Sequence, residues 1–98
     1  MREQWEYNIL RCIDSLSGEA CLGDIYDEIG KFVDLTEEHR RYDHRWKEPA
    51  YHIQIRRHIK NLRQKGELEW VSKGCYSLRE EGQERLMREK PIEDAEEV

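Results

Sequence analysis

Apolar residues recur at helical spacing near the start of the chain. Positions three and four residues apart fall on one side of an α-helix, because the helix has about 3.6 residues per turn. This pattern predicts a helix from Glu3 to Ser17, and Gly18 is suited to end it in a left-handed conformation. The apolar stripe of this helix consists of Trp5, Ile9, Cys12, Ile13 and Leu16.

A second helix is predicted after a short extended stretch from Ala20 to Leu22. Asp24 is a residue type that favours a helix start. The apolar residues after it again share one side: Ile25, Ile29, Phe32 and Val33. The segment from Asp34 to Glu48 is polar and dense in charge, so we expect a connection there, with a helical turn after Thr36.

A third helix is predicted from Pro49 to Gln64, since proline is well suited to the first turn of a helix. Its apolar side carries Ile55, Ile59 and Leu62, with Tyr51 at the margin. At about 100° per residue, the opposite side carries Ala50, Ile53, Gln54, Arg57, Lys60, Asn61 and Gln64, and one flank carries Arg56 and Arg63. No acid occurs between Pro49 and Gly66, which is unusual for a helix face that is merely solvated.

Two strand-like runs follow, Leu68 to Val71 and Cys75 to Leu78. The turn residues Ser72-Lys73-Gly74 between them predict a hairpin. A short last helix is expected to reach about Lys90, with Leu86 and Met87 as its apolar residues. We therefore expect one domain over residues 1–90 and an acidic, flexible tail over residues 91–98.

Charge is distributed unevenly along the chain. The net charge of -5 and a charged fraction of 40%, against about 25% in typical domains, suggest at first an acidic, soluble protein. Residues 39–65, however, hold nine cations and two anions, a net of +7, while the other 71 residues have a net of -12. A concentrated basic block of this kind favours a polyanionic partner.

The order of three helices, a hairpin and a short helix is that of a winged helix-turn-helix, an α+β fold whose third helix enters the major groove and whose hairpin is the wing. The chain resembles the N-terminal winged-helix domain of Mrr-type restriction proteins, and related domains of restriction and defence nucleases. The resemblance is carried by Asp24-Ile25-Tyr26-Asp27-Glu28-Ile29, Ile55-Arg56-Arg57-His58-Ile59-Lys60-Asn61-Leu62, Lys65-Gly66-Glu67-Leu68-Glu69, Gly74-Cys75-Tyr76-Ser77-Leu78 and Glu81-Gly82.

These observations predict a module that binds double-stranded DNA by sequence or by shape, without catalytic activity. Gln54, Arg57 and Asn61 are expected to read base edges. Phosphate contacts are expected from Arg40, Arg41, Arg45, Lys47, Arg56 and Arg63. The resemblance also implies DNA contacts at Lys60 and at Lys73 in the wing. It leaves open whether the chain is a small transcription regulator or part of a restriction protein; whole Mrr-type proteins add a nuclease domain, for which 98 residues leave no room.

Other functions are kept as alternatives or excluded by composition. A protein-interaction winged helix, which docks a partner through Ile53, Trp46 and Tyr51, is the main alternative. A homodimer through Trp5, Leu86 and Met87 stays open. No motif predicts an enzyme, a metal or another cofactor.

Targeting and cysteine usage suggest a cytoplasmic protein. No apolar run is long enough to cross a membrane, and the N-terminus lacks the apolar segment of a secretory signal. Three cysteines, an odd number, predict free thiols in a reducing compartment, with Cys12 and Cys75 in the core.

Overall fold

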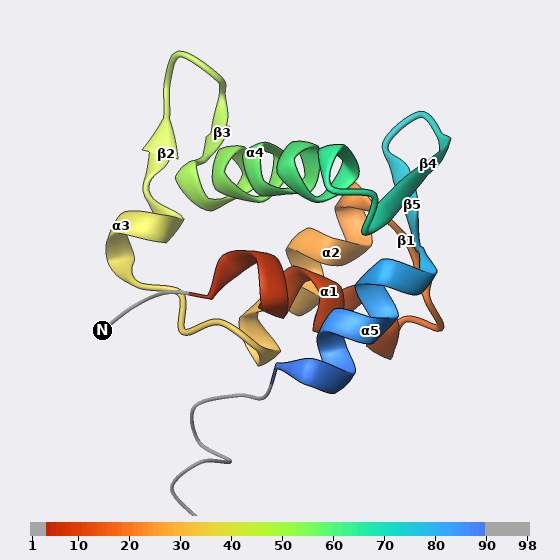
Figure 1. The fold of residues 1–98 in the computed structure, drawn as a ribbon. Coiled ribbons are helices and arrows are strands. Elements are labelled where there is room, and N and C mark those ends of the chain that lie inside the picture. Colours follow the sequence, from red (N-terminus) through yellow and green to blue (C-terminus); the bar gives the residue numbers. More distant parts are fainter. Residues whose placement is uncertain (1–3, 90–98) are drawn as a thin grey trace, which may run out of the picture.

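Helices and short strands alternate along residues 4–89, the part of the chain that the structure, a computed structural model, describes (Figure 1). The predicted α+β class is confirmed: within these residues, five α-helices accompany small antiparallel sheets. The elements in chain order are α1 (Trp5–Ser15), β1 (Glu19–Cys21), α2 (Leu22–Glu28), η1 (Ile29–Lys31), α3 (Glu37–Arg40), β2 (Tyr42–Asp43), β3 (Glu48–Pro49), α4 (Ala50–Gln64), β4 (Leu68–Ser72), β5 (Cys75–Leu78) and α5 (Glu80–Arg88).

The core forms around α1, which packs against α2, α4 and α5. α1 and α4 bury the apolar stripes that their sequence period predicts, and burial of one Ile or Leu side chain stabilises the fold by about 1.5–3 kcal/mol. α5 departs from the prediction, because Met87 is 81% exposed. In Figure 1, α4 and α5 lie on opposite sides of α1. The largest fully buried side chains are Ile9, Leu10, Ile13, Ile25, Ile29, Ile55, Ile59 and Leu62.

Most predicted elements are present, with shifted ends. Ser17 and Gly18 follow α1 with positive φ angles of 73° and 86°, so the left-handed stop is confirmed. The second helix begins at Leu22, earlier than expected, and its last turn is the 3₁₀ segment η1. Pro49 precedes α4 in an extended conformation. The predicted acidic tail at 91–98 lies outside the described residues.

The predicted two-stranded hairpin is part of a three-stranded antiparallel sheet with the order β1-β5-β4. The extended stretch predicted near Ala20 forms β1 and pairs along β5, with Ala20 opposite Tyr76. Ser72 pairs with Cys75, which shortens the expected turn to Lys73 and Gly74. Gly74 has a φ of +73°, a conformation that glycine adopts without strain.

A disulfide joins Cys21 of β1 to Cys75 of β5, so the prediction of free thiols is wrong for these two residues. The sheet register places them directly opposite each other, although 54 positions separate them in the sequence. Cys75 is half-buried and does not belong to the core, also contrary to the prediction. Cys12 is free and fully buried, as predicted.

The polar segment before α4 is more ordered than its composition suggests. The helical turn predicted after Thr36 is confirmed as α3, where the Thr36 hydroxyl accepts the His39 N–H and the His39 ring accepts the Thr36 N–H. Next, β2 and β3 pair to form a hairpin whose tip is residues 44–47. The sequence did not predict this hairpin, because each strand has only two residues.

Within residues 4–89, the structure contains no helix that is both long and apolar enough to span a bilayer.

Candidate nucleic-acid interface

Helix α4 presents a polar surface on the side opposite the core. Ile55, Ile59 and Leu62 are buried against the rest of the protein. Arg57 and Lys60 are exposed, and Gln54 and Asn61 are partly exposed beside them. Arg57 lies three residues after Gln54, and Lys60 and Asn61 lie three and four residues after Arg57, so the four residues form one stripe along the helix. The structure therefore brings the four predicted α4 contacts together.

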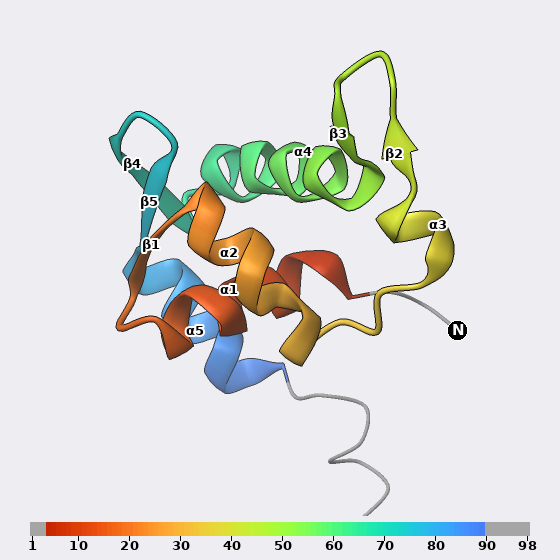
Figure 2. The same cartoon turned by 180° about the vertical axis from the view of Figure 1, so that it is seen from behind.

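Two hairpins rise at the ends of α4, on the side away from α1. Figures 1 and 2, seen from opposite sides, both show the β2–β3 hairpin beside the N-terminal end of α4 and the β4–β5 hairpin beside its C-terminal end. The helix α4 runs between the two hairpins. We use the term basic face for this surface, which carries Arg45, Lys47, Arg57, Lys60, Arg63 and Lys73.

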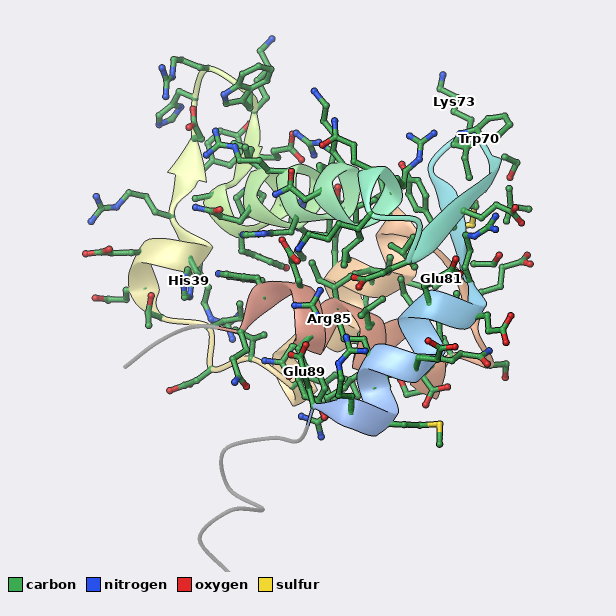
Figure 3. The ribbon with its side chains drawn as sticks, viewed as in Figure 1. His39, Trp70, Lys73, Glu81, Arg85 and Glu89 are labelled. Carbon is green, nitrogen blue, oxygen red and sulfur yellow. A yellow bond between two sulfur atoms is a disulfide. The ribbon has the colours of Figure 1, made fainter. Side chains whose placement is uncertain are left out.

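Four cations of α4 and of the β4–β5 hairpin are available for a ligand. Within residues 4–89, none of Arg57, Lys60, Arg63 and Lys73 forms an ion pair. The Arg63 guanidinium lies 5.8 Å from the centre of the Tyr76 ring, which orients it without neutralising it. Lys73 extends from the tip of the hairpin next to Trp70 (Figure 3).

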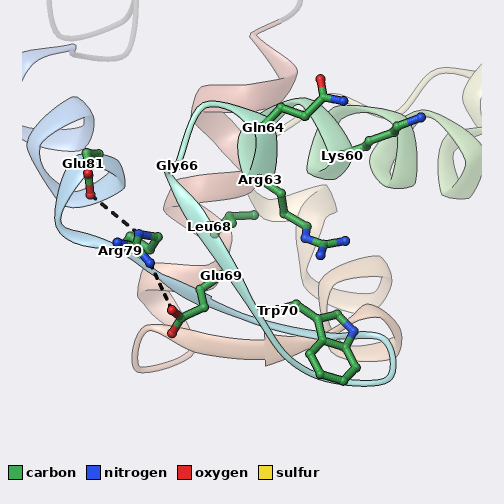
Figure 4. Close-up of a pocket in the computed structure, with 9 residues that line it drawn as sticks. All are labelled: Lys60, Arg63, Gln64, Gly66, Leu68, Glu69, Trp70, Arg79 and Glu81. Atoms are coloured by element: carbon green, nitrogen blue, oxygen red, sulfur yellow. Dashed lines mark hydrogen bonds and ion pairs between the residues drawn. The ribbon is translucent and has the colours of Figure 1, made fainter.

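An open groove of about 500 Å³ separates the C-terminal half of α4 from β4 (Figure 4). Lys60 and Arg63 line its helix side, and Trp70 lines its strand side. At the far end Arg79 is 3.0 Å from Glu69 and 3.8 Å from Glu81, so that cation is neutralised. The positive charge of the groove is therefore concentrated on the α4 side.

The β2–β3 hairpin adds a second group of exposed cations. The side chain of Arg45 is 85% exposed, with its Nε 3.7 Å from Asp43 Oδ1, a weak surface contact. Lys47 is exposed at the tip, while Arg40 and Arg41 are exposed at the end of α3, at the base of the hairpin. The predicted phosphate contacts before α4 thus lie together at one end of the basic face.

Arg56, one of the predicted phosphate contacts, forms an ion pair within the protein although its side chain is 35% exposed. Its Nη1 and Nη2 donate to Glu48 Oε1 and Oε2 at 2.6 and 2.7 Å, and Nη1 also donates to the Tyr26 hydroxyl at 3.1 Å. Hydrogen bonding to Arg56 lowers the pKa of Glu48, and the same contact raises the pKa of Arg56. Arg56 therefore joins β3 to α4 and α2.

His52 completes this junction. Its ring stacks on Tyr26 with centroids 3.7 Å apart, and its Nδ1 lies 3.3 Å from Glu48 Oε1. Burial lowers the pKa of His52 although Glu48 acts to raise it. The junction orients the β2–β3 hairpin on α4 through uncharged stacking as well as an ion pair.

On the opposite side of the molecule, Arg85 is held by a network of ion pairs. Arg85 donates to Glu6 at 3.0 Å, to Glu67 at 2.8 Å and to Glu89 at 2.8 Å. Partial burial acts to raise the pKa of Glu6, but hydrogen bonds from Lys65 and Arg85 outweigh it and hold the pKa at about 2. In Figure 3, Arg85 and Glu89 lie far from the hairpin tip that carries Lys73.

The structure also bears on the alternative surfaces. A homodimer interface through Trp5 was kept open from the sequence. Trp5 is only 5% exposed and belongs to the core, so it is not available for such an interface. Leu86 packs against the core, whereas Met87 is 81% exposed. Of the three residues expected to dock a protein, Tyr51 packs on the core and Ile53 is half-buried, which leaves Trp46 exposed.

Sequence reasoning missed one exposed aromatic side chain of the basic face. Trp70 was expected in the strand that begins at Leu68. Leu68 is buried, yet Trp70 is 53% exposed, because β4 is an edge strand that extends beyond the core. The placement of Trp70 two residues before the turn was the available signal. Among the described residues, no group of three or more His, Cys, Asp or Glu side chains could hold a metal ion.

Comparison of the chain with protein-family models, with curated proteins and with solved structures found no match. The chemistry of the chain's own residues is therefore the basis on which a function is proposed.

Proposed function

We propose that this chain is a winged helix-turn-helix module that binds double-stranded DNA, with α4 in the major groove and the β4–β5 hairpin as the wing. The order α1, β1, α2, α4, β4, β5 supports this fold, as does the sheet order β1-β5-β4. The chain departs from the simplest form of the fold by inserting α3 and the β2–β3 hairpin before α4. The module has no catalytic activity of its own in this proposal.

The dimensions of α4 suit a major groove. An α-helix with its side chains is about 10–12 Å wide, and the groove is about 12 Å wide. The 15 residues of α4 give a length of about 22 Å. Both ends of the helix therefore approach the phosphate backbones that border the groove.

The observation that carries the proposal is the gathering of unpaired cations on the basic face. Within residues 4–89 only Arg45 among them has a carboxylate partner, through a weak contact, whereas Lys31, Lys65, Arg79 and Arg85 elsewhere are ion-paired. Arg11 on α1 and Arg88 on α5 also have no ion pair within these residues, but they lie on other helices. Several like charges gathered on one face attract an oppositely charged polymer and speed its association with that face. Phosphates are the anions that such a face fits.

The proposed contacts divide by chemistry. In this proposal Arg57 and Lys60 donate to guanine, and Gln54 and Asn61 pair with adenine. The cations at the two ends of α4, together with Arg63 and Lys73, are placed to bind phosphates and fix the register on the duplex. Such a module serves either as a small regulator or as the DNA-recognition domain of a restriction or defence protein.

The test is a titration of a labelled 20-base-pair duplex at several salt concentrations. Neutralising about five phosphates gives a slope of log affinity against log salt of about -4 to -5. Binding that does not depend on salt, or no binding at low salt, would overturn the proposal.

A protein partner is the second candidate, favoured by the exposure of Trp46 at the hairpin tip. Fold alone does not decide between the two functions. Ile53→Glu and Arg57→Glu distinguish them: loss of a protein complex through Ile53→Glu alone, with duplex binding intact, favours the protein partner.

A further inference from the structure

The β2–β3 hairpin occupies a position on α4 that mirrors the position of the β4–β5 hairpin. Both hairpins project on the same side of the helix, one at each end, and the two opposite views agree on this arrangement (Figures 1 and 2). A ligand that rests on the outer side of α4 therefore meets a projection at each end.

The β2–β3 hairpin is held in this position by specific contacts. The Ala50 N–H donates to the Arg41 carbonyl at 2.8 Å, which joins the first residue of α4 to the start of the hairpin. The Glu48–Arg56 ion pair at 2.6 Å fixes the returning strand to the helix. The hairpin is therefore a rigid extension of α4.

The tip is also ordered by its own backbone contacts. The Lys47 N–H donates to the Asp43 carbonyl at 2.7 Å, and the Arg45 N–H donates to the Asp43 carboxylate at 2.9 Å. These bonds close the four-residue tip and fix the direction in which Trp46 leaves it. Order of this kind reduces the entropy that binding would cost.

The chemistry of the two tips is also alike. Trp46 is 59% exposed and stands between Arg45 and Lys47. Trp70 is 53% exposed and stands near Lys73. A large aromatic side chain left in water at a hairpin tip is unfavourable in the free protein, and contact with an apolar surface of a ligand removes that cost.

We propose that the β2–β3 hairpin is a second wing, and that Trp46 enters the minor groove beside the major groove that α4 occupies, with Arg45 and Lys47 on the bordering phosphates. This inference rests on the proposed function. A minor groove flanks the major groove on each side, so projections at both ends of a docked helix face flanking grooves. Apolar side chains wedge between base steps there, and cations follow the narrow, negative groove.

The experiment uses tryptophan fluorescence together with the anisotropy of a labelled duplex. In the variant Trp70→Phe, the remaining indoles are Trp46 and the buried Trp5. We expect its emission to be quenched as a 20-base-pair duplex is added, over the same concentration range in which the duplex anisotropy rises. The double variant Trp46→Phe, Trp70→Phe is the matched control, in which only Trp5 reports and no quenching is expected.

Each outcome decides one point. Quenching in Trp70→Phe and its absence in the double variant support the second wing. A rise in anisotropy without quenching in Trp70→Phe overturns the second wing and leaves DNA binding intact. No rise in anisotropy for the wild type overturns the proposed function and the second wing together.

A minor-groove ligand tests the groove itself. Saturation of an A·T-rich duplex with netropsin should reduce the quenching of Trp46 in Trp70→Phe. Trp46→Ala should weaken duplex binding by at least about fivefold, the lower end of the loss expected when one aromatic contact with a base is removed, with an unchanged thermal midpoint because the side chain is exposed. Unchanged quenching with netropsin bound would overturn the minor-groove assignment.

Discussion

Glu48 and Arg56 form an ion pair with two parallel hydrogen bonds, at 2.6 and 2.7 Å, that joins the strand before α4 to the second turn of that helix. Arg56, which the sequence predicted as a phosphate contact, thus connects two segments of the protein. The Arg56 guanidinium also donates to the Tyr26 hydroxyl at 3.1 Å, so it links β3, α4 and α2. The direction of the β2–β3 hairpin depends on this junction.

The first prediction concerns this pair. Glu48→Gln should lower the free energy of unfolding by about 1 kcal/mol, since one hydrogen bond to an amide oxygen survives but the charge is lost, and the pair is partly exposed. Urea denaturation measures the change. Glu84→Gln is the matched control, because Glu84 is exposed and forms no ion pair within residues 4–89. Equal stability of the two variants would contradict a structural role for Glu48.

The second prediction concerns acid stability. The pKa of Glu6 falls from 4.5 to about 2 on folding, through Lys65 and Arg85, although burial opposes the change. Since folding favours the charged carboxylate, its contribution is complete above about pH 4.5 and is lost as the pH falls toward 2. Glu6→Gln should cost about 2 kcal/mol at neutral pH and much less at pH 2. The free energy of unfolding against pH measures this.

Glu84→Gln again serves as the control for the pH series. A loss of stability in Glu6→Gln that stays constant from pH 7 to pH 2 would show that the Glu6 carboxylate does not keep its charge through the contacts seen here.

The third prediction concerns Gly82 in α5. A Cβ built at this position lies 2.5 Å from the Glu67 carbonyl oxygen, so α5 approaches the start of β4 too closely for a side chain. Alanine normally stabilises a helix over glycine by about 1 kcal/mol, but Gly82→Ala should destabilise the protein by about 1–3 kcal/mol. Gly23→Ala in α2, with nothing within 4 Å of the Cβ, should not destabilise it. A higher thermal midpoint for Gly82→Ala would refute the close packing.

The fourth prediction concerns the cysteines. With Cys21 bonded to Cys75 and Cys12 free, thiol titration of the denatured protein should find one thiol without reductant and three after reduction. Reduction should lower the free energy of unfolding by about 2–4 kcal/mol, because the bridge closes a long loop. Three thiols without reductant would show that the bridge is absent.

The sequence was sufficient for the elements whose apolar positions follow a regular period. The stripe of Ile55, Ile59 and Leu62 predicted both the buried side of α4 and, by subtraction, its exposed side. The division of charge along the chain singled out the segment that supplies every cation of the basic face except Lys73, which the total of -5 concealed. Both features can be read from the sequence because helical period follows from local backbone geometry and charge follows from residue type.

Features that depend on the register between distant segments were missed. The pairing of Cys21 with Cys75 follows from the alignment of β1 with β5, which no local pattern encodes. The capture of Arg56 by Glu48 requires the hairpin turn that brings β3 back to α4. Helical periodicity placed Arg56 correctly on the flank of α4 but could not show which neighbour would use its charge.

Charge reversal at two exposed arginines tests the central claim, binding of duplex DNA by the basic face. Arg57→Glu on α4 and Arg88→Glu on α5 change the net charge equally, and both residues are exposed. The measurement is the affinity of each variant for a 20-base-pair duplex at low salt. The account predicts at least about a tenfold loss for Arg57→Glu, as expected when a base contact is lost, and little change for Arg88→Glu. Equal losses in the two variants, or no loss in Arg57→Glu, would contradict it.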